Sequence, residues 1–179
     1  MIRLAKLCRS VASLLLLALL AQAWPSAAIE AAAQQVQKGP VSGQPVPRFQ
    51  SLRSDRVNLR EGPSKDHRTL WVFERAGLPV EVTAEFEIWR RIRDSEGAEG
   101  WVLSALLSKR RTALVAPWKK EPLLLTASDH KTPLAKLAPG VIGNLRGCDG
   151  LWCRIAGQGF DGYMPQESLW GVYPGEKVE

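Results

Sequence analysis

Alternation of hydrophobic and polar residues is most regular in the stretch 77–107. Every second residue from Val80 to Ala84 is hydrophobic, which is the period of a half-buried strand. Two further short strands are predicted to begin at Trp89 and Gly100, with small and polar turn residues between them. The stretch therefore predicts three consecutive strands.

The same layout recurs about 60 residues later, in the stretch 140–169. Trp152 corresponds there to Trp89, and Gly162-Tyr163-Met164 corresponds to Gly100-Trp101-Val102. Strands this short and evenly spaced, without amphipathic helices, are typical of small β-barrels. We therefore expect an all-β chain in which one small unit is used twice.

The pattern predicts four segments along the chain. They are a signal peptide (1–28), a flexible linker (29–48), a first barrel (49–117) and a second barrel (118–175). The strand 112–115 is assigned to the end of the first barrel. The linker is rich in Ala, Gln and Pro, so we expect a tether that contributes nothing to a core.

The first 28 residues have the order of a secretory signal peptide. Basic residues at positions 3, 6 and 9 precede an apolar run of 13 residues, which is short for a bilayer span. Cleavage is expected after Ala23 or after Ala28, and the alternative is an uncleaved N-terminal anchor. We therefore expect a periplasmic or secreted protein with no transmembrane segment in the mature chain.

The net charge of the mature chain is modest. The full sequence has 24 Lys and Arg against 18 Asp and Glu, a net charge of +6. Removal of residues 1–28 takes away three basic residues and no acidic ones, so 21 − 18 leaves +3. This mild excess favours an anionic surface weakly and does not indicate dedicated nucleic-acid binding.

Motifs in both halves resemble the bacterial SH3-like domain, and specifically a subgroup found in tandem in exported bacterial proteins. The motifs in the first half are VNLREGPS at 57–64, GLPVEV at 77–82, a W-x-x-I strand and GWV at 100–102. The second half matches chiefly through the sequence GYMP at 162–165. The resemblance covers residues 50–173. It implies two five-stranded barrels that act in binding or scaffolding, often at the cell wall.

Cys148 and Cys153 flank Asp149-Gly150, a dipeptide typical of hairpin turns. A two-residue turn would place the cysteines diagonally on one face, whereas a loop over 149–152 would place them directly opposite each other. Either register allows a bridge, and an oxidising compartment favours one. We expect a structural disulfide, because the redox-active alternative lacks C-x-x-C spacing.

The tryptophans raise the question of a binding groove. Trp89 and Trp152 each stand three residues before an isoleucine. An odd separation places two residues on opposite faces of a strand, so the tryptophans point outward if the isoleucines point inward. Three alternatives stay open: a groove, packing between the units, or a return to the core through a bulge. The groove candidates are Trp89, Trp152, Tyr163, Pro165 and Trp101.

Two basic runs in the first unit suggest a cationic patch for an anionic polymer, a lipid headgroup or an acidic partner. The residues of this patch are Arg90, Arg91, Arg93, Lys109, Arg110 and Arg111. The alternative is an ordinary solvated face, and three glutamates at 81, 85 and 87 would neutralise part of the charge.

The sequence contains no catalytic or metal-binding pattern. Acyl transfer needs a nucleophile, a base and an orienting group, whereas His67 and His130 fall in polar, turn-like stretches where we expect them to be solvated. Two distant histidines also supply too few metal ligands. We expect a non-enzymatic binding module without a cofactor that contacts peptidoglycan or an envelope protein. The alternatives are an adaptor whose aromatic surfaces pack the two barrels together and, remotely, a hydrolase accessory protein or an enzyme.

Overall fold

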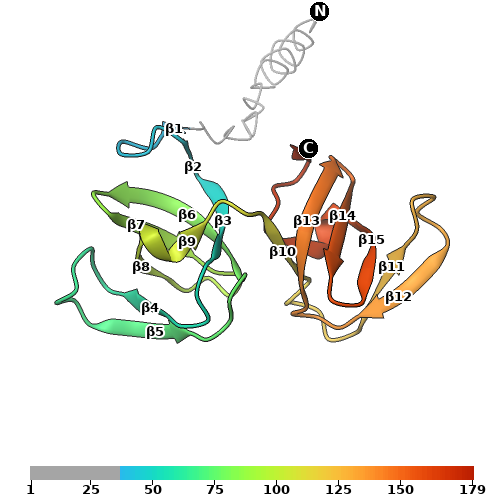
Figure 1. The fold of residues 1–179 in the computed structure, drawn as a ribbon, viewed down its shortest axis with the longest axis horizontal. Coiled ribbons are helices and arrows are strands. Elements are labelled where there is room, and N and C mark those ends of the chain that lie inside the picture. Colours follow the sequence, from blue (N-terminus) through green and yellow to red (C-terminus); the bar gives the residue numbers. More distant parts are fainter. Residues whose placement is uncertain (1–36) are drawn as a thin grey trace, which may run out of the picture. The chain divides into compact units, whose positions relative to one another are not determined.

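The computed structural model describes residues 37–179, which belong to one compact unit (Figure 1). The predicted signal peptide and the first part of the predicted linker lie outside the described residues. Within 37–179 the regular structure consists of strands and two short 3₁₀ turns, arranged in one two-stranded, one seven-stranded and one eight-stranded sheet. The expectation of an all-β chain is confirmed.

The first barrel is a seven-stranded antiparallel sheet in the order β5-β4-β8-β7-β6-β3-β9. Its elements are β3 (Arg48–Leu52), β4 (Val57–Arg60), β5 (Thr69–Phe73), β6 (Pro79–Phe86), β7 (Trp89–Arg93), β8 (Glu99–Leu103), η1 (Ser104–Leu106) and β9 (Leu107–Ser108). Its core is formed by fully buried side chains from five strands, among them Val80 and Val82 of β6 and Ile92 of β7. Val80 and Val82 face the core, as the alternation in the sequence predicts. A register shift between Val82 and Ala84 interrupts the pattern, and Ala84 lies outside the core cluster.

The second barrel repeats this order element by element, as β12-β11-β15-β14-β13-β10-β16. Its elements are β10 (Thr112–Val115), β11 (Leu123–Thr126), β12 (Pro133–Leu137), β13 (Ile142–Asp149), β14 (Trp152–Gly157), β15 (Phe160–Pro165), η2 (Gln166–Ser168) and β16 (Leu169–Trp170). A short strand β17 (Lys177–Val178) is added beside β13. The internal repeat and the two-barrel fold class predicted from the sequence are confirmed.

The strand β10 lies in a different sheet from the one that the sequence analysis assigns to it. We expected residues 112–115 to close the first barrel, but they pair with β13 and β16 of the second. β9 already occupies the corresponding edge of the first sheet, next to β3. All four residues of β10 are buried, so this strand is the first structural strand of the second barrel.

A disulfide joins Cys148 and Cys153 at the end of the β13–β14 hairpin. The two residues are paired directly opposite each other, so the register with the longer loop is the one adopted. The Asp149 carboxylate accepts hydrogen bonds from the backbone N–H groups of Leu151 and Trp152, at 2.8 and 2.7 Å, and Gly150 has a positive φ of 104°. Because the closed ring is small, the bridge stabilises the fold by about 2 kcal/mol.

Residues 37–48 form an ordered hairpin, which corrects our expectation of a flexible tether for this part of the linker. β1 (Gln37–Lys38) pairs with β2 (Pro45–Val46). The turn between them is fixed by the buried carboxylate of Glu85 on β6, which accepts hydrogen bonds from the N–H of Val41 and from the N–H and hydroxyl of Ser42. Arg48 forms an ion pair with the same carboxylate at 2.8 Å. The Glu85 side chain therefore fixes the turn of the hairpin against the first barrel.

Aromatic side chains make several of the contacts between the two barrels, beside hydrogen bonds from Arg75 to the carbonyl of Gly140 and from Thr112 to the carbonyl of Gly77. The ring of Phe49 in β3 lies 5.2 Å from that of Trp170 and 4.7 Å from that of Tyr173. Trp170 donates a hydrogen bond to the carbonyl of Pro79 at 3.1 Å, and the Tyr173 hydroxyl donates one to the Glu81 carboxylate at 2.9 Å. Neither Trp89 nor Trp152 takes part in these contacts.

Because the Glu85 carboxylate holds the β1–β2 hairpin, we expect the attachment of this hairpin to depend on pH. Burial raises the pKa of this carboxyl, but hydrogen bonds from Ser42, Arg48 and Val41 outweigh that effect and lower it from 4.5 to about 2. The ionised form is thus favoured in the folded state. Its stabilising contribution is complete above pH 4.5 and is lost as the pH falls towards 2.

We expect Glu85→Gln to lower the free energy of unfolding at pH 7 by about 3 kcal/mol, because Arg48 loses its buried partner. Urea denaturation measures this change. Amide hydrogen exchange should also show that Val41 and Ser42 lose protection while the core strands keep theirs. Glu87→Gln, the same change at an exposed neighbour, is the control. Unaltered protection at Val41 and Ser42 in Glu85→Gln would contradict the assignment.

Candidate functional site

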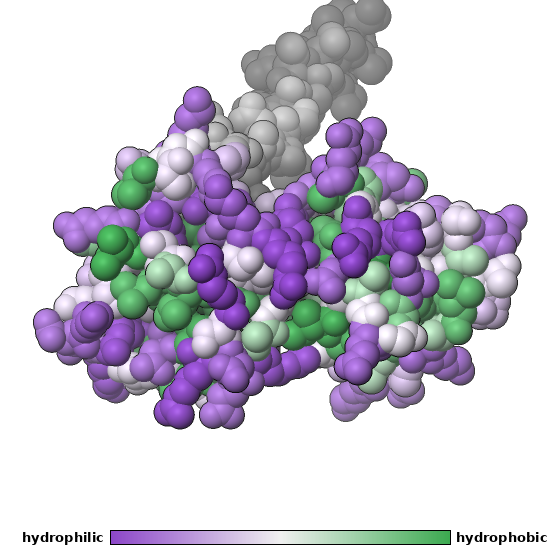
Figure 2. Space-filling view, in the orientation of Figure 1, coloured by the Kyte–Doolittle hydropathy of each residue, from purple (hydrophilic) through white to green (hydrophobic). Residues whose placement is uncertain are grey.

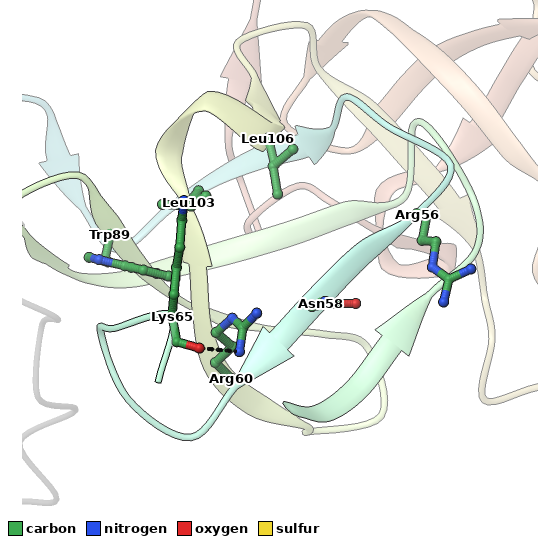
Figure 3. A pocket seen from close by; sticks show the side chains of 7 residues that line it. All are labelled: Arg56, Asn58, Arg60, Lys65, Trp89, Leu103 and Leu106. Atoms are coloured by element: carbon green, nitrogen blue, oxygen red, sulfur yellow. Dashed lines mark hydrogen bonds between the residues drawn. The ribbon is translucent and has the colours of Figure 1, made fainter. Parts of the chain in front are cut away.

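A pocket of about 290 Å³ lies on the first barrel, between the loop 61–68 and the start of β7 (Figure 3). Its lining combines three cations with apolar and amide side chains. These residues are Arg56, Asn58, Arg60, Lys65, Trp89, Leu103 and Leu106. The side chains come from β4, the 61–68 loop, β7, β8 and η1, so strands distant in sequence assemble the pocket.

Trp89 forms one wall of this pocket. It pairs with Leu103 across β7 and β8, and it does not belong to the core cluster that contains Ile92. Trp89 is therefore separate from the side chains that pack around Ile92. However, the side chain is only 6% exposed, so Trp89 is a covered residue that lines a pocket and not the solvent-facing anchor that we expected.

Arg60 holds the loop 61–68 in place beside Trp89. Its Nη1 donates a hydrogen bond to the backbone carbonyl of Lys65 at 2.9 Å (Figure 3). The same Nη1 donates to the carbonyl of His67 at 2.8 Å. Lys65 is thereby kept on the lining of the pocket. The sequence analysis missed Arg60 and Lys65, although Arg60 lies within the VNLREGPS motif at 57–64 and Lys65 directly follows it.

The second barrel brings Trp152, Tyr163 and Pro165 together, as expected for a groove. Trp152 and Pro165 are paired across β14 and β15. The imidazole of His130 stacks on the Trp152 ring, with centroids 4.3 Å apart and an interplanar angle of 10°. The same imidazole lies 5.3 Å from the Tyr163 ring. We call the group formed by His130, Trp152, Tyr163 and Pro165 the aromatic cluster.

His130 is half-buried in this cluster, which corrects our expectation that it is solvated. It has a positive φ of 58°, a conformation uncommon outside glycine. The preceding Asp129 stabilises this turn, because its carboxylate accepts hydrogen bonds from the Thr132 hydroxyl and from the N–H groups of Lys131 and Thr132. These bonds lower the pKa of Asp129 to about 2. His67, in contrast, is exposed in the first barrel.

Equivalent positions of the two barrels differ in charge. Arg60 pairs with Trp101 in the first barrel, and Thr126 pairs with Tyr163 at the corresponding place in the second. Two residues earlier, Asn58 of β4 corresponds to Leu124 of β11. The first barrel therefore presents cations and an amide beside its tryptophan, whereas the second presents a hydroxyl and an aliphatic side chain.

Trp101 lies apart from the lining of the first pocket. It is half-buried on β8, between Arg60 of β4 and Arg91 of β7 in the strand register. Arg91 in turn forms an ion pair with Glu99 at 2.6 Å. Trp101 thus lies next to Arg60 at the border of the Trp89 pocket and does not line it.

The expected cationic patch is divided by ion pairs. Four arginines of the patch each lie within salt-bridge distance of a carboxylate. These pairs are Arg90–Glu85, Arg91–Glu99, Arg93–Glu81 and Arg111–Glu176. Arg110 and Lys109 are exposed and line a different pocket, together with Arg90. The six cations therefore do not form one continuous surface.

Within residues 37–179, no helix is long and apolar enough to cross a bilayer. The same part of the chain holds no group of three or more His, Cys, Asp or Glu side chains placed to bind a metal ion.

Comparison with protein families identifies both barrels. The bacterial SH3 domain family matches residues 53–109 and 125–171, which together make up more than half of the chain. The chain belongs to the bacterial SH3 domain family. Each match covers most strands of one barrel, and the family identified is one of binding modules with no catalytic domain among the matches. No curated protein matches the chain.

The burial of the tryptophans predicts unequal contributions to stability. Trp89→Ala should lower the free energy of unfolding by about 3–5 kcal/mol, as is usual for a buried tryptophan. Trp152→Ala should cost about 1–2 kcal/mol, because this ring is half-buried. Urea denaturation measures both changes.

Trp71→Ala is the control, since Trp71 is 59% exposed on β5 and should change stability by no more than about 0.5 kcal/mol. Equal losses from Trp89→Ala and Trp71→Ala would show that the covered position of Trp89 contributes nothing to the fold.

Proposed function

We propose that this protein is an exported, non-enzymatic binding protein of the bacterial cell envelope. Its first SH3 domain binds peptidoglycan or an envelope protein in the pocket beside Trp89. The aromatic cluster of the second domain is the corresponding surface there. Both barrels belong to a family of binding modules, and the choice of an envelope ligand rests on the predicted export signal together with the disulfide.

The composition of the Trp89 pocket carries this proposal. Arg56, Arg60 and Lys65 place three positive charges around an indole and two leucines, and no Asp or Glu is among the described residues that line the pocket. Such a lining suits a ligand that carries both a carboxylate and an apolar or sugar face. The cations attract the carboxylate, while the indole and the two leucines supply the apolar part of the lining. Peptides with free carboxylates, as in cell-wall material, have this character.

The adaptor alternative receives less support from the contacts. In that hypothesis the aromatic surfaces of the two barrels bury each other. Trp89 instead lines a pocket made entirely by its own barrel, and Trp152 stacks on His130 of its own barrel. The aromatic contacts between barrels use Phe49, Trp170 and Tyr173, which leaves both tryptophan sites available for a ligand.

Export is supported by two independent features. The order of basic, apolar and small residues in 1–28 is that of a cleaved leader. The Cys148–Cys153 bridge suits an oxidising compartment outside the cytoplasm. We therefore propose a periplasmic or secreted location.

The pocket is tested by reversing its exposed charges. Arg56 and Lys65 are both exposed, so Arg56→Glu/Lys65→Glu should fold normally while it weakens co-sedimentation with purified sacculi by about tenfold or more. Lys136→Glu, which reverses an exposed cation on β12 of the other barrel, is the control and should bind as the unaltered protein does.

Equal binding by the Arg56→Glu/Lys65→Glu protein and the control would exclude this pocket. If the unaltered protein does not bind sacculi, pull-down from solubilised envelope tests the protein ligand in the same way. Absence of binding in both assays would refute the proposed function.

Export predicts a processed N-terminus. N-terminal sequencing of the protein recovered outside the cytoplasm should begin after Ala23 or after Ala28. An intact Met1 on a membrane-embedded product would identify the segment as an anchor.

A further inference from the structure

A second pocket of the first barrel, of about 550 Å³, is lined by five cations. It lies between the β1–β2 turn, β3, β7 and the chain that follows η1. The cations are Arg48, Arg53, Arg90, Lys109 and Arg110. No Asp or Glu is among the described residues that line it. Hydrophilic side chains cover much of the surface seen in Figure 2. Charge alone therefore does not distinguish this pocket from the rest of the surface, whereas its concave shape does.

The positive charge of this pocket exceeds the neighbouring negative charge. Glu85 lies within 2.8 Å of Arg48 and 3.4 Å of Arg90, so one carboxylate faces two guanidinium groups. Among the described residues, no carboxylate lies within salt-bridge distance of Arg53, Lys109 or Arg110. The five cations and Glu85 together leave a net charge of +4. Like charges gathered without partners repel each other, so an anion that enters the pocket is strongly favoured.

Neutral hydrogen-bond donors accompany these charges. Gln50, Ser104 and Ser108 also line the pocket. The Ser108 hydroxyl oxygen accepts a hydrogen bond from the N–H of Arg110 at 3.2 Å, which leaves its own hydrogen to donate. A ligand in this pocket therefore meets several guanidinium, ammonium, amide and hydroxyl donors.

We propose that this pocket binds a phosphate group, carried either by a membrane lipid headgroup or by a soluble phosphorylated molecule. A carboxylate offers two acceptor oxygens in one plane, whereas a phosphate offers three or more that point in different directions. The lining donors come from four separate segments of chain, so they can approach a ligand from more than one direction, which suits a phosphate better. Arginine pairs with phosphate through two parallel hydrogen bonds. This site is distinct from the Trp89 pocket and does not depend on the proposed function.

The charges that frame the pocket are held by the fold. The Arg90 Nη1 donates to the carbonyls of Glu87 and Trp89, at 2.9 and 2.7 Å. The Arg53 Nη2 donates to the carbonyl of Leu107 at 3.2 Å. Arg48 is fixed by Glu85 and by the carbonyl of Pro45. Arg53, Lys109 and Arg110 are exposed. Among the described residues, the side chains of Lys109 and Arg110 make no hydrogen bond or ion pair, so they are the groups to substitute without disturbing the barrel.

The experiment compares two double variants of equal charge. Lys109→Glu/Arg110→Glu reverses two cations of this pocket, and Arg56→Glu/Lys65→Glu reverses two cations of the Trp89 pocket. Binding of glycerol 1-phosphate is followed by NMR titration, with acetate as the carboxylate probe. Binding to phosphatidylcholine vesicles with and without phosphatidylglycerol is followed by co-sedimentation. Thermal melts check that each variant is folded.

We expect the unaltered protein to bind glycerol 1-phosphate more tightly than acetate. Lys109→Glu/Arg110→Glu should lose about tenfold or more of this affinity, while Arg56→Glu/Lys65→Glu should retain it. The exchange Lys109→Arg/Arg110→Lys keeps the charge and should bind normally. Vesicle binding that requires phosphatidylglycerol and is lost in the same variant assigns the phosphate to a lipid headgroup, and binding of the soluble probe alone assigns it to a soluble molecule.

Three results would overturn the proposal. The first is the absence of binding to both phosphate probes. The second is an equal loss in the two double variants, which would mean that only the net charge matters. The third is acetate binding as tight as that of glycerol 1-phosphate. Sacculus binding, measured on the same proteins, reports separately on the Trp89 pocket.

Discussion

The buried carboxylate of Glu85 is the contact on which the functional face of the first barrel depends. One side chain accepts hydrogen bonds from the β1–β2 turn, pairs with Arg48 of β3 and lies 3.4 Å from Arg90 of β7. A buried carboxylate is costly unless its oxygens are fully bonded, and here both are. Arg90 in turn donates to the carbonyl of Trp89. The same carboxylate thus organises the lining of the pocket with five cations and the backbone beside the tryptophan pocket.

The two barrels keep one fold and differ in the chemistry of their surfaces. Cross-strand ion pairs recur at corresponding places, Arg91–Glu99 in the first and Arg154–Asp161 in the second. The residues beside the tryptophans do not recur, because Arg60 is replaced by Thr126 and the loop of the second barrel places His130 on Trp152. Residues in the core are constrained by packing, whereas the residues around each tryptophan can differ to suit different ligands.

The local sequence pattern predicted the features of the fold that depend on residues close together in the chain. Alternation at Val80 and Val82 identified the core face, and the Asp149-Gly150 turn located the disulfide. The failures concern contacts between distant residues. Nothing within residues 112–115 states which sheet they join. Parity concerns the face of a strand and does not predict that Trp89 is only 6% exposed. The donors to Glu85 likewise lie more than 35 positions away.

Only three residues, 109–111, separate the last strand of the first barrel from the first strand of the second. In tandem domains, a long linker usually lets the two binding sites reach distant parts of a ligand. The distance between the two sites is then variable. Here the spacing between the two tryptophan sites is fixed by the fold. A polymer whose recognition groups repeat at that spacing would be held at two points and released slowly, whereas a polymer of another repeat would be held at one. If the proposed ligand is a polymer, its affinity for the protein would then depend on its repeat length.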